Sequence, residues 1–407
     1  MDLEVSRSNL KTFWRKIMSK NSIPAVRFCD FSDNWESKKI GDLGSVSMNK
    51  RIFKDETSET GEVPFYKIGT FGSEPDSFIT REKFEEYKSK YPYPEIGDIL
   101  ISASGSIGRT VEYHGEEAYF QDSNIVWLKH DERLNNSFLK QFYSIVKWEG
   151  IEGTTIKRLY NKNILETPIS FPSPAEQSAI GTLFRTLDDL LSSYKDNLAN
   201  YQSLKATMLS KMFPKAGQTV PEIRLDGFEG EWEEKEFIQI VNRVTESSDS
   251  DSLPKVEFED IISGQGKLNK DISSKFDNRK GILFKPGYTL YGKLRPYLNN
   301  WLLPKFEGVA LGDFWVFDPN GNNSDFIYYL VQSSRYQKVA NDTSGTKMPR
   351  SDWKSVSTTI FAIPQTIAEK QAIGAYFSNL DNLINSHQEK ISQLEILKKK
   401  FLQDMFI

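Results

Sequence analysis

The residue types that most often carry catalysis are sparse in this chain. It has one cysteine, Cys29, and three histidines, His114, His130 and His387. A single cysteine cannot form an intrachain disulfide, and the scattered histidines do not match the spacing of a multi-ligand zinc cluster. No serine and aspartate stand in supporting positions around His114 or His130, so we interpret both as loop histidines rather than members of a catalytic triad.

One pair of carboxylates has the loose spacing of a metal-dependent nuclease. Asp76 is followed by Glu86 and Lys88, and nuclease sites use two carboxylates to hold Mg²⁺ with a lysine nearby. The stretch around Glu86, REKFEEYKSK, also alternates in charge, as the solvated face of a helix does. We favour the solvated helix and keep a stand-alone Mg-dependent nuclease as an alternative function.

Motifs for nucleotide cofactors are missing from the sequence. Gly264-Gln265-Gly266-Lys267 lacks both the spacing of a phosphate-binding loop and the Ser or Thr that follows its lysine. The chain has no Pro-Pro pair, which excludes the Asn/Asp-Pro-Pro-aromatic segment of an adenine methyltransferase. We therefore expect a noncatalytic protein that holds neither a metal nor a cofactor itself.

Small, basic and aromatic residues suited to DNA contact gather in four short segments. Small residues let backbone N–H groups approach phosphates, and Arg, Lys and Tyr are typical of groove contacts. The candidate DNA-binding residues are Ser104, Gly105, Ser106, Arg109, Thr154, Thr155, Lys157, Arg158, Lys293, Arg295, Tyr297, Thr346, Lys347 and Arg350.

Length and composition limit the classes of protein to consider. At 407 residues the chain is too long for one core and predicts two or three domains. Its net charge of −4 argues against a protein that coats nucleic acid nonspecifically, although local basic surfaces remain compatible. No apolar run reaches the roughly 18 to 20 residues that span a bilayer, and no signal peptide is recognisable. We expect a cytoplasmic protein.

The sequence repeats itself. PAVRFCDFSDNWESKKI (24–40) aligns without gaps with PEIRLDGFEGEWEEKEF (221–237), at an offset of 221 − 24 = 197. AEQSAIGTLFRTLDDLL (175–191) aligns with AEKQAIGAYFSNLDNLI (368–384), at an offset of 368 − 175 = 193. Repeats at both ends of each half indicate one module duplicated in tandem.

Between these ends the two halves share a skeleton of short apolar runs. Runs of β-branched and aromatic residues bounded by Gly, Pro, Asn and Asp predict strands, so each half is expected to be a mixed sheet with one or two helices. The corresponding segments are 95–113 and 285–301, 123–128 and 313–318, and 138–145 and 326–333. Trp35 and Trp232, at the start of each half, are interpreted as core anchors rather than platforms for stacked bases.

Each half ends in a long amphipathic segment. Apolar residues recur there in alternating steps of three and four, which predicts a helix with one apolar seam. One such seam cannot bury itself, so we expect the two helices to pair as an antiparallel coiled coil. The interface is expected to contain Ile180, Phe184, Leu187, Leu191, Ile373, Phe377, Leu380 and Ile384.

Five strings in this order resemble the DNA specificity subunits (S subunits, HsdS-like) of type I restriction–modification systems. The resemblance runs from Ile23 to the C-terminus. It departs from the pattern at AIPQTIAEKQ (362–371), which is one residue longer between Pro and Glu than FPSPAEQ. The strings are PAVRF…W (24–35), GDILISASGSIGRT (97–110), FPSPAEQSAI (171–180), YGKLRPYLNNW (291–301) and SGTKMPRSDW (344–353).

The resemblance implies a fold and a function. It implies an α+β chain with two target recognition domains, each reading half of a bipartite site in double-stranded DNA. The paired helices would hold the domains apart and dock two modification (methyltransferase) subunits. S-adenosylmethionine, ATP and Mg would be bound by partners, which methylate adenine and, with restriction/translocase subunits, cleave DNA. The expected division is an extension 1–20, a recognition domain 21–172, a spacer helix 173–214, a recognition domain 215–366 and a spacer helix 367–407.

Two further points stay open at this level. A coiled-coil scaffold carrying two peptide-binding modules is another alternative function, and the sequence does not specify which bases are read. Residues 10–19 faintly resemble residues 204–213. They are expected either to form a short helix bracing the C-terminal tail or to belong to a dispensable leader before Met18.

Overall fold

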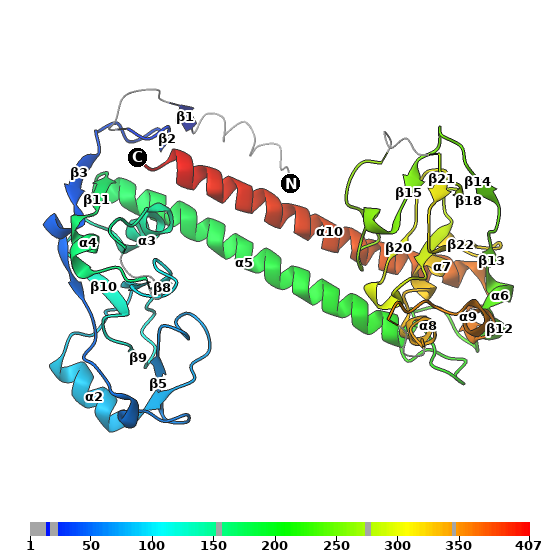
Figure 1. The fold of residues 1–407 in the computed structure, drawn as a ribbon, viewed down its shortest axis with the longest axis horizontal. Helices are drawn as coiled ribbons and strands as arrows, with labels where there is room; N and C mark the ends of the chain where they lie inside the picture. Colours follow the sequence, from blue (N-terminus) through cyan, green and yellow to red (C-terminus); the bar gives the residue numbers. More distant parts are fainter. Residues whose placement is uncertain (1–13, 17–22, 152–156, 273–277, 344–346) are drawn as a thin grey trace. The chain divides into compact units, whose positions relative to one another are not determined.

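The computed structural model describes residues 14–16, 23–151, 157–272, 278–343 and 347–407. The chain divides into two compact units, the first formed by residues 1–193 with 391–407 and the second by residues 194–390. The long helices α5 (Pro174–Lys211) and α10 (Ile367–Asp404) each contribute to both units (Figure 1). Each unit therefore combines one α/β module with parts of both helices.

The module of the first unit contains a four-stranded antiparallel sheet in the order β4-β10-β7-β8. Its two central strands are buried along most of their length, as apolar runs such as ILIS predict. Helix α3 (Asn136–Ile145) contacts β7 and β8, and the side chain of Asn135 caps its N-terminus. The strands are β4 (Gly44–Ser47), β10 (Ile125–His130), β7 (Ile99–Ser102) and β8 (Thr110–Glu112).

A smaller sheet and several short elements complete the first unit. Strand β5 pairs in parallel with β9 and antiparallel with β6, and helix α2 buries Phe84. These elements are β5 (Val63–Tyr66), β6 (Phe78–Ile79), β9 (Tyr119–Phe120), α2 (Arg81–Lys90), the pair β1 (Trp14–Lys16) and β2 (Val26–Phe28), the pair β3 (Glu36–Lys39) and β11 (Pro168–Phe171), η1 (Ile40–Asp42), η2 (Lys54–Glu56) and α4 (Asn161–Glu166).

The second unit repeats the principal sheet in the order β13-β22-β19-β20 and adds a sheet in the order β14-β18-β21-β15. Its elements are β12 (Glu233–Glu236), α6 (Phe237–Ile240), β13 (Asn242–Arg243), β14 (Ser247–Ser248), β15 (Lys255–Val256), η3 (Phe258–Asp260), β16 (Ile261–Ile262), β17 (Lys267–Leu268), β18 (Gly281–Phe284), β19 (Thr289–Gly292), η4 (Pro296–Leu298), β20 (Trp301–Leu302), β21 (Gly308–Ala310), β22 (Phe314–Asp318), α7 (Ser324–Leu330), α8 (Ser334–Ala340), α9 (Trp353–Ser357) and β23 (Ile360–Ile363). Strand β12 pairs with β23, and β16 with β17.

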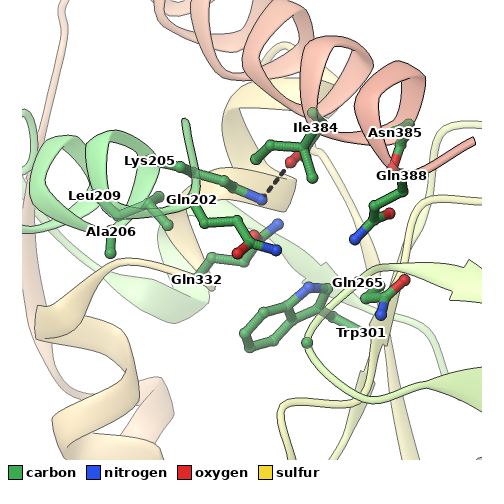
Figure 2. Close-up of a pocket in the computed structure, with 12 residues that line it drawn as sticks. Gln202, Lys205, Ala206, Leu209, Gln265, Trp301, Gln332, Ile384, Asn385 and Gln388 are labelled. Atoms are coloured by element: carbon green, nitrogen blue, oxygen red, sulfur yellow. Dashed lines mark hydrogen bonds and ion pairs between the residues drawn. The ribbon is translucent and has the colours of Figure 1, made fainter. Parts of the chain in front are cut away.

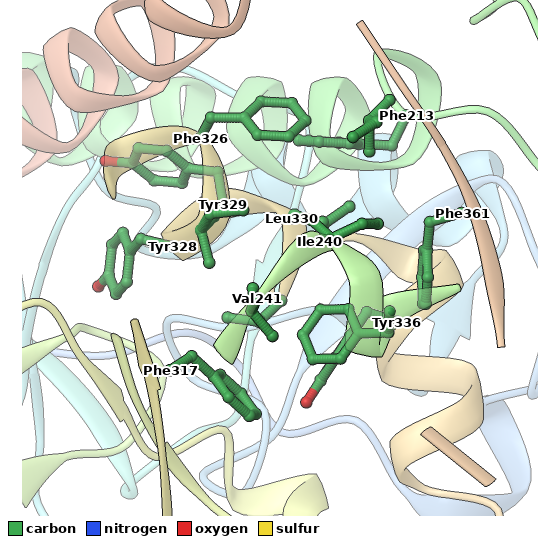
Figure 3. Close-up of a cluster of buried hydrophobic side chains, with 14 of the residues drawn as sticks. Phe213, Ile240, Val241, Phe317, Phe326, Tyr328, Tyr329, Leu330, Tyr336 and Phe361 are labelled. Carbon is green, nitrogen blue, oxygen red and sulfur yellow. The ribbon is translucent and has the colours of Figure 1, made fainter. Parts of the chain in front are cut away.

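The core of the second unit is rich in aromatic side chains (Figure 3). It joins the segment just after helix α5 to helix α10, because Phe213 stacks on Phe377 of α10 with their ring centroids 6.0 Å apart. Phe237 lies edge-on to Phe317 of β22 at 5.2 Å. This core includes Trp232, which is 3% exposed, and its counterpart Trp35 in the first unit is 5% exposed. Both tryptophans are thus buried at the start of their modules.

The two modules share the predicted skeleton. Strands β7 and β19 each follow a glycine turn, with φ of +94° at Gly97 and +83° at Gly287. Further along each module lies a central strand, β10 or β22, and directly after it a helix, α3 or α7. The expectation of mixed sheets is confirmed. The number of helices is higher than the one or two expected per half, because the described part of the first module contains α2, α3 and α4 and that of the second contains α6, α7, α8 and α9.

The two long helices run antiparallel within each unit. In the first unit the ring of Phe184 on α5 lies 6.3 Å from that of Phe406, just after α10, and Asp188 bonds Lys398 at 2.5 Å. In the second unit Lys205 bonds Asp381 at 2.7 Å, and the ring of Phe213, just after α5, lies 6.0 Å from that of Phe377. Rising numbers on α5 therefore face falling numbers on α10. The predicted seam residues Ile180, Phe184, Leu187 and Leu191 are 2, 0, 6 and 8% exposed, and their counterparts Ile373, Phe377, Leu380 and Ile384 have the same values.

The short helix considered for residues 10–19 is not found where the chain is described. Residues Trp14–Lys16 form strand β1, which pairs antiparallel with Val26–Phe28. Backbone pairing with the adjacent strand therefore replaces helix formation at these three residues. Residues 1–13 and 17–22 lie outside the described part of the chain.

Candidate nucleic acid interface

In the first module the turn between β7 and β8 lies against the segment that leads to helix α4. The N–H of Gly105 donates to the carbonyl of Lys157 at 3.3 Å, and the N–H of Leu159 donates to Ala103 at 2.8 Å. Ser104 and Arg158 form an isolated β-bridge between these bonds. Two of the predicted DNA-contact segments, far apart in the sequence, are therefore neighbours.

The second module brings its two candidate segments together in the same way. The N–H of Arg295 donates to the carbonyl of Pro349 at 2.7 Å, and the N–H of Ser351 donates to Lys293 at 2.9 Å. Leu294 and Arg350 form the isolated bridge. The pattern of two hydrogen bonds around one bridge is thus common to both modules, and we call each such pair of segments a paired turn.

The paired turn of the first module presents cations on an exposed surface. Lys157 and Arg158 are both exposed, as are Ser106 and Arg109. The guanidinium of Arg109 donates to the backbone carbonyl of Phe71 at 2.7 Å, which fixes its direction. Ser104 is buried instead, and its hydroxyl donates to Asn124 at 2.7 Å, so the hydroxyl already has a partner within the protein.

In the second module an aspartate holds two of the predicted cations. Arg350 lies 3.0 Å and Lys293 3.7 Å from the carboxylate of Asp313. The hydrogen bond to Asp313 also raises the pKa of Arg350. The sequence analysis did not single out Asp313; its position directly before the apolar strand β22 (Phe314–Asp318) was the available signal, whereas its two cations lie far from it in the sequence.

Arg295 and Tyr297 are placed differently from the aspartate-bound cations. Both are exposed, Tyr297 to 57%. Within the described residues the Arg295 guanidinium has no hydrogen-bond or ion-pair partner. Lys347 is exposed as well, while the predicted contacts Thr154, Thr155 and Thr346 lie outside the described residues. The paired turns therefore present exposed cations in both modules.

A buried ion pair fixes the start of each module to the first turn of its helix. Arg27 donates two hydrogen bonds to Glu176 at 2.7 and 2.6 Å. Arg224 donates two to Glu369 at 2.7 and 2.9 Å. The pairing escaped the sequence analysis, although the recurrence of both partners at equivalent positions was a usable signal. Bidentate geometry of this kind sets the orientation of the groups it joins.

The second unit also contains a cavity of about 220 Å³ beside the helix pair (Figure 2). The ion pair between Lys205 and Asp381 lines one side. Trp301 and Gln332 line the other, and the indole N–H and the amide oxygen of these two buried residues have no hydrogen-bond partner among the described residues. The cavity is a feature of the joint between the second module and its helices.

The carboxylates considered for a nuclease are each bonded to a lysine. Asp76 lies 2.8 Å from Lys67, and Glu86 lies 3.0 Å from Lys90 one turn along α2. Within the described ranges no three His, Cys, Asp or Glu side chains are grouped so as to hold a metal ion. Among the helices that the structure describes, none combines the length and apolar character needed to cross a membrane.

Part of the chain is similar in sequence to a known protein. A putative type I restriction enzyme specificity subunit of Haemophilus influenzae is 53% identical over 161 residues. That match covers 39% of this chain and 42% of the relative, less than half the length of either.

Solved structures show the fold over nearly the whole chain. The S subunit of a type I restriction–modification system from M. genitalium matches with a TM-score of 0.60 and 16% identity, covering 95% of this chain and 99% of that one. A chain from a structure concerned with complex assembly and conformational transition of the type I system matches with a TM-score of 0.50 and 12% identity, covering 91% and 97%.

A family model supports the resemblance in both halves. The model described as the type I restriction modification DNA specificity domain matches residues 32–200 and again residues 232–396. Each match contains one paired turn and the first part of the long helix that follows. These specificity proteins are noncatalytic, in agreement with the expectation from the missing motifs. Because the two matches span most of the sequence, the chain belongs to the family of type I restriction–modification DNA specificity subunits.

Proposed function

We propose that this chain reads a bipartite site in double-stranded DNA and directs adenine methylation there by partner subunits. The observation that carries the proposal is the duplicated paired turn, because each module assembles the same two basic segments around an equivalent β-bridge. Two similar surfaces with different side chains suit a target of two dissimilar half-sites. Base edges supply the sequence information, while phosphate contacts position the protein.

The proposed contacts divide by exposure and charge. Lys157, Arg158 and Lys347 are exposed cations suited to phosphates, and Thr154, Thr155 and Thr346 stand beside them in sequence. Lys293 and Arg350, neutralised in part by Asp313, are better suited to positioning. Ser106, Arg109, Arg295 and Tyr297 lie on or beside the turns and are proposed to approach the DNA together with the backbone of Gly105.

Two copies of one partner would find equivalent surfaces on the helices. In the first unit Leu190 and Leu397 are 42% and 38% exposed, and in the second unit their repeat counterparts Leu383 and Leu204 are 40% and 36% exposed. Exposed leucines that recur at equivalent positions favour a repeated docking surface. We propose that each unit binds one modification subunit, and that these partners hold S-adenosylmethionine.

Further restriction/translocase subunits are proposed to complete the assembly in the cytoplasm and to bring the ATP- and Mg-dependent cleavage. The related structure named for complex assembly of a type I system supports an assembled state in that system. In this proposal the chain itself supplies recognition and binds no cofactor.

The test compares the chain alone with the assembled complex. Pure chain incubated with DNA and Mg²⁺ is expected to cause neither nicking nor methylation. Coexpressed with its methyltransferase subunit, it is expected to give adenine methylation at one split motif in methylome sequencing. Methylation that is the same with and without this chain, or nicking by the chain alone, would contradict the proposal.

A further inference from the structure

The two paired turns share one position with an unusual backbone conformation. Gly105 and Arg295 occupy equivalent positions, since each donates its N–H across the paired turn and each follows the bridged residue, Ser104 or Leu294. Their φ angles are +65° and +47°, both in the left-handed region. Glycine adopts this region freely, whereas any other residue brings its Cβ close to the following carbonyl oxygen.

The second module therefore carries an arginine where the backbone favours glycine. The first module shows that glycine meets the requirement of the turn, and among the described residues a Cβ at Gly105 would find only Ile68 within 4 Å, at 3.9 Å. Space thus does not exclude a side chain at this position. A strained conformation persists where the surrounding structure holds it and where the side chain is needed.

Hydrogen bonds on both sides hold the Arg295 turn in its conformation. The N–H of Arg295 bonds Pro349 at 2.7 Å, and that of Leu298 bonds back to Arg295 at 2.8 Å. On the far side of η4 the carbonyl of Asn299, itself at φ +55°, accepts from Gly264 at 3.0 Å. The turn is bonded to two other segments of the second module, which gives its side chains a defined position.

The arginine side chain itself is left available. Lys293 and Arg350 share Asp313, but the exposed guanidinium of Arg295 has no such partner within the described residues. Its planar fork matches the O6 and N7 acceptors of guanine in the major groove, the commonest base-specific contact. Tyr297, two residues on and 57% exposed, adds an aromatic surface beside it.

We infer that Arg295 reads a guanine in the half-site of the second module, and that the turn accepts left-handed strain in order to present it. The inference rests on the proposed function and assigns one residue to one base. It separates Arg295 from Lys293 and Arg350, which position the turn without reading sequence. The half-site of the second module must then contain at least one G·C pair, and the first module, with glycine at this position, uses other residues.

The experiment uses the full chain assembled with its methyltransferase subunits. Each guanine of the second half-site is replaced in turn by 7-deazaguanine, which lacks the N7 acceptor. Arg295→Gly, which removes both hydrogen bonds, is expected to weaken binding to unmodified DNA about 5- to 150-fold, the range of a bidentate contact. One 7-deazaguanine replacement should weaken binding by the wild-type complex by a smaller factor, because the O6 acceptor remains, and should cause no further loss in the Arg295→Gly complex.

Thermal unfolding of the full chain separates recognition from folding. Arg295→Gly relieves the strain, so its melting temperature should equal or exceed that of the wild type, while Arg295→Ala should lie below Arg295→Gly. Lys305→Ala, which removes an exposed cation outside the paired turn, serves as the control and should keep wild-type binding.

Three outcomes would overturn the inference. They are an Arg295→Gly complex that binds the same motif with wild-type affinity, one that weakens equally on all DNA sequences, and a wild-type complex indifferent to every 7-deazaguanine. A wild-type complex that binds no specific sequence at all would instead contradict the proposed function.

Discussion

The two modules are fixed to their helices by the same bonds, yet they differ at the turns proposed to meet DNA. Arg27 with Glu176 corresponds to Arg224 with Glu369. Gly105, in contrast, corresponds to Arg295 at the centre of the paired turn. Duplication has therefore kept the chemistry that sets the position of each module while the residues available for recognition have diverged.

Even the shared bonds differ in how far they are buried. The side chains of Arg27 and Glu176 are 4% and 1% exposed, whereas those of Arg224 and Glu369 are 16% and 4% exposed. Glu369 also accepts a hydrogen bond from the Trp232 indole at 3.0 Å, and the indole N–H of the equivalent Trp35 has no partner among the described residues. The Glu176 carboxylate therefore lacks the tryptophan hydrogen bond that supports Glu369, and it relies more on its arginine.

This contrast gives the largest expected effect. Arg27→Met should destabilise the first unit by about 3–5 kcal/mol, because it leaves the Glu176 carboxylate buried without its cation. Arg224→Met should cost the second unit less, since Glu369 keeps the Trp232 bond and is nearer solvent. Hydrogen exchange resolves the two units separately. The double variant Arg27→Met/Glu176→Gln should recover part of the loss, and equal protection losses in both units would contradict the comparison.

The two ion pairs between the long helices should differ less in their contribution to the free energy of unfolding. Lys205 and Asp381 are 14% and 24% exposed, and Asp381 also accepts a hydrogen bond from Tyr329 at 2.8 Å. Lys398 and Asp188 are 27% and 35% exposed. Asp381→Asn should therefore cost about 1–2 kcal/mol and Asp188→Asn at most about 1 kcal/mol in the free energy of unfolding.

Tyr329→Phe provides the control for the helix pairs in urea unfolding. In a Tyr329→Phe chain, Asp381→Asn should lower the free energy of unfolding by about as much as Asp188→Asn does in the wild-type chain. The reason is that the hydrogen bond from Tyr329 to Asp381 is then absent before and after the Asp381→Asn change. If Asp188→Asn lowered the free energy of unfolding more than Asp381→Asn, burial would not determine which of the two ion pairs contributes more to stability.

The smallest effects are expected from the exposed lysines of the two paired turns. Lys157→Ala and Lys347→Ala should each weaken binding of the assembled complex to all DNA sequences alike. Each should reduce the slope of log K against log salt by about 0.9, the value for one phosphate contact. An unchanged slope for either variant would remove that lysine from the phosphate contacts.

Much of the fold could be predicted because it rests on local patterns. The alternating apolar steps predicted the spacer helices 173–214 and 367–407, which the structure places at Pro174–Lys211 and Ile367–Asp404. Glycine turns followed by apolar runs predicted β7 and β19. Both patterns depend on residues close together in the sequence, so they can be recognised without knowledge of the tertiary packing.

Features that depend on distant contacts were not predictable in the same way. The bond from Arg27 to Glu176 joins residues 149 positions apart. The turn that holds Arg295 at its left-handed φ is bonded through the N–H of Arg295 to Pro349 and through the carbonyl of Asn299 to Gly264. Arginine has no intrinsic preference for that conformation. Strand β1, where a helix was considered, likewise results from pairing with β2.

Methylome sequencing of a chain with an exchanged module tests directly whether each module reads one half-site. Residues 45–150 are replaced by the corresponding region of a family member that has a different target, and the chain is coexpressed with its own methyltransferase subunit. We expect a methylated motif in which one half-site is new and the other half-site is unchanged, because each module reads one half-site. A motif with both half-sites changed, or with neither changed, would contradict the assignment of one half-site to each module.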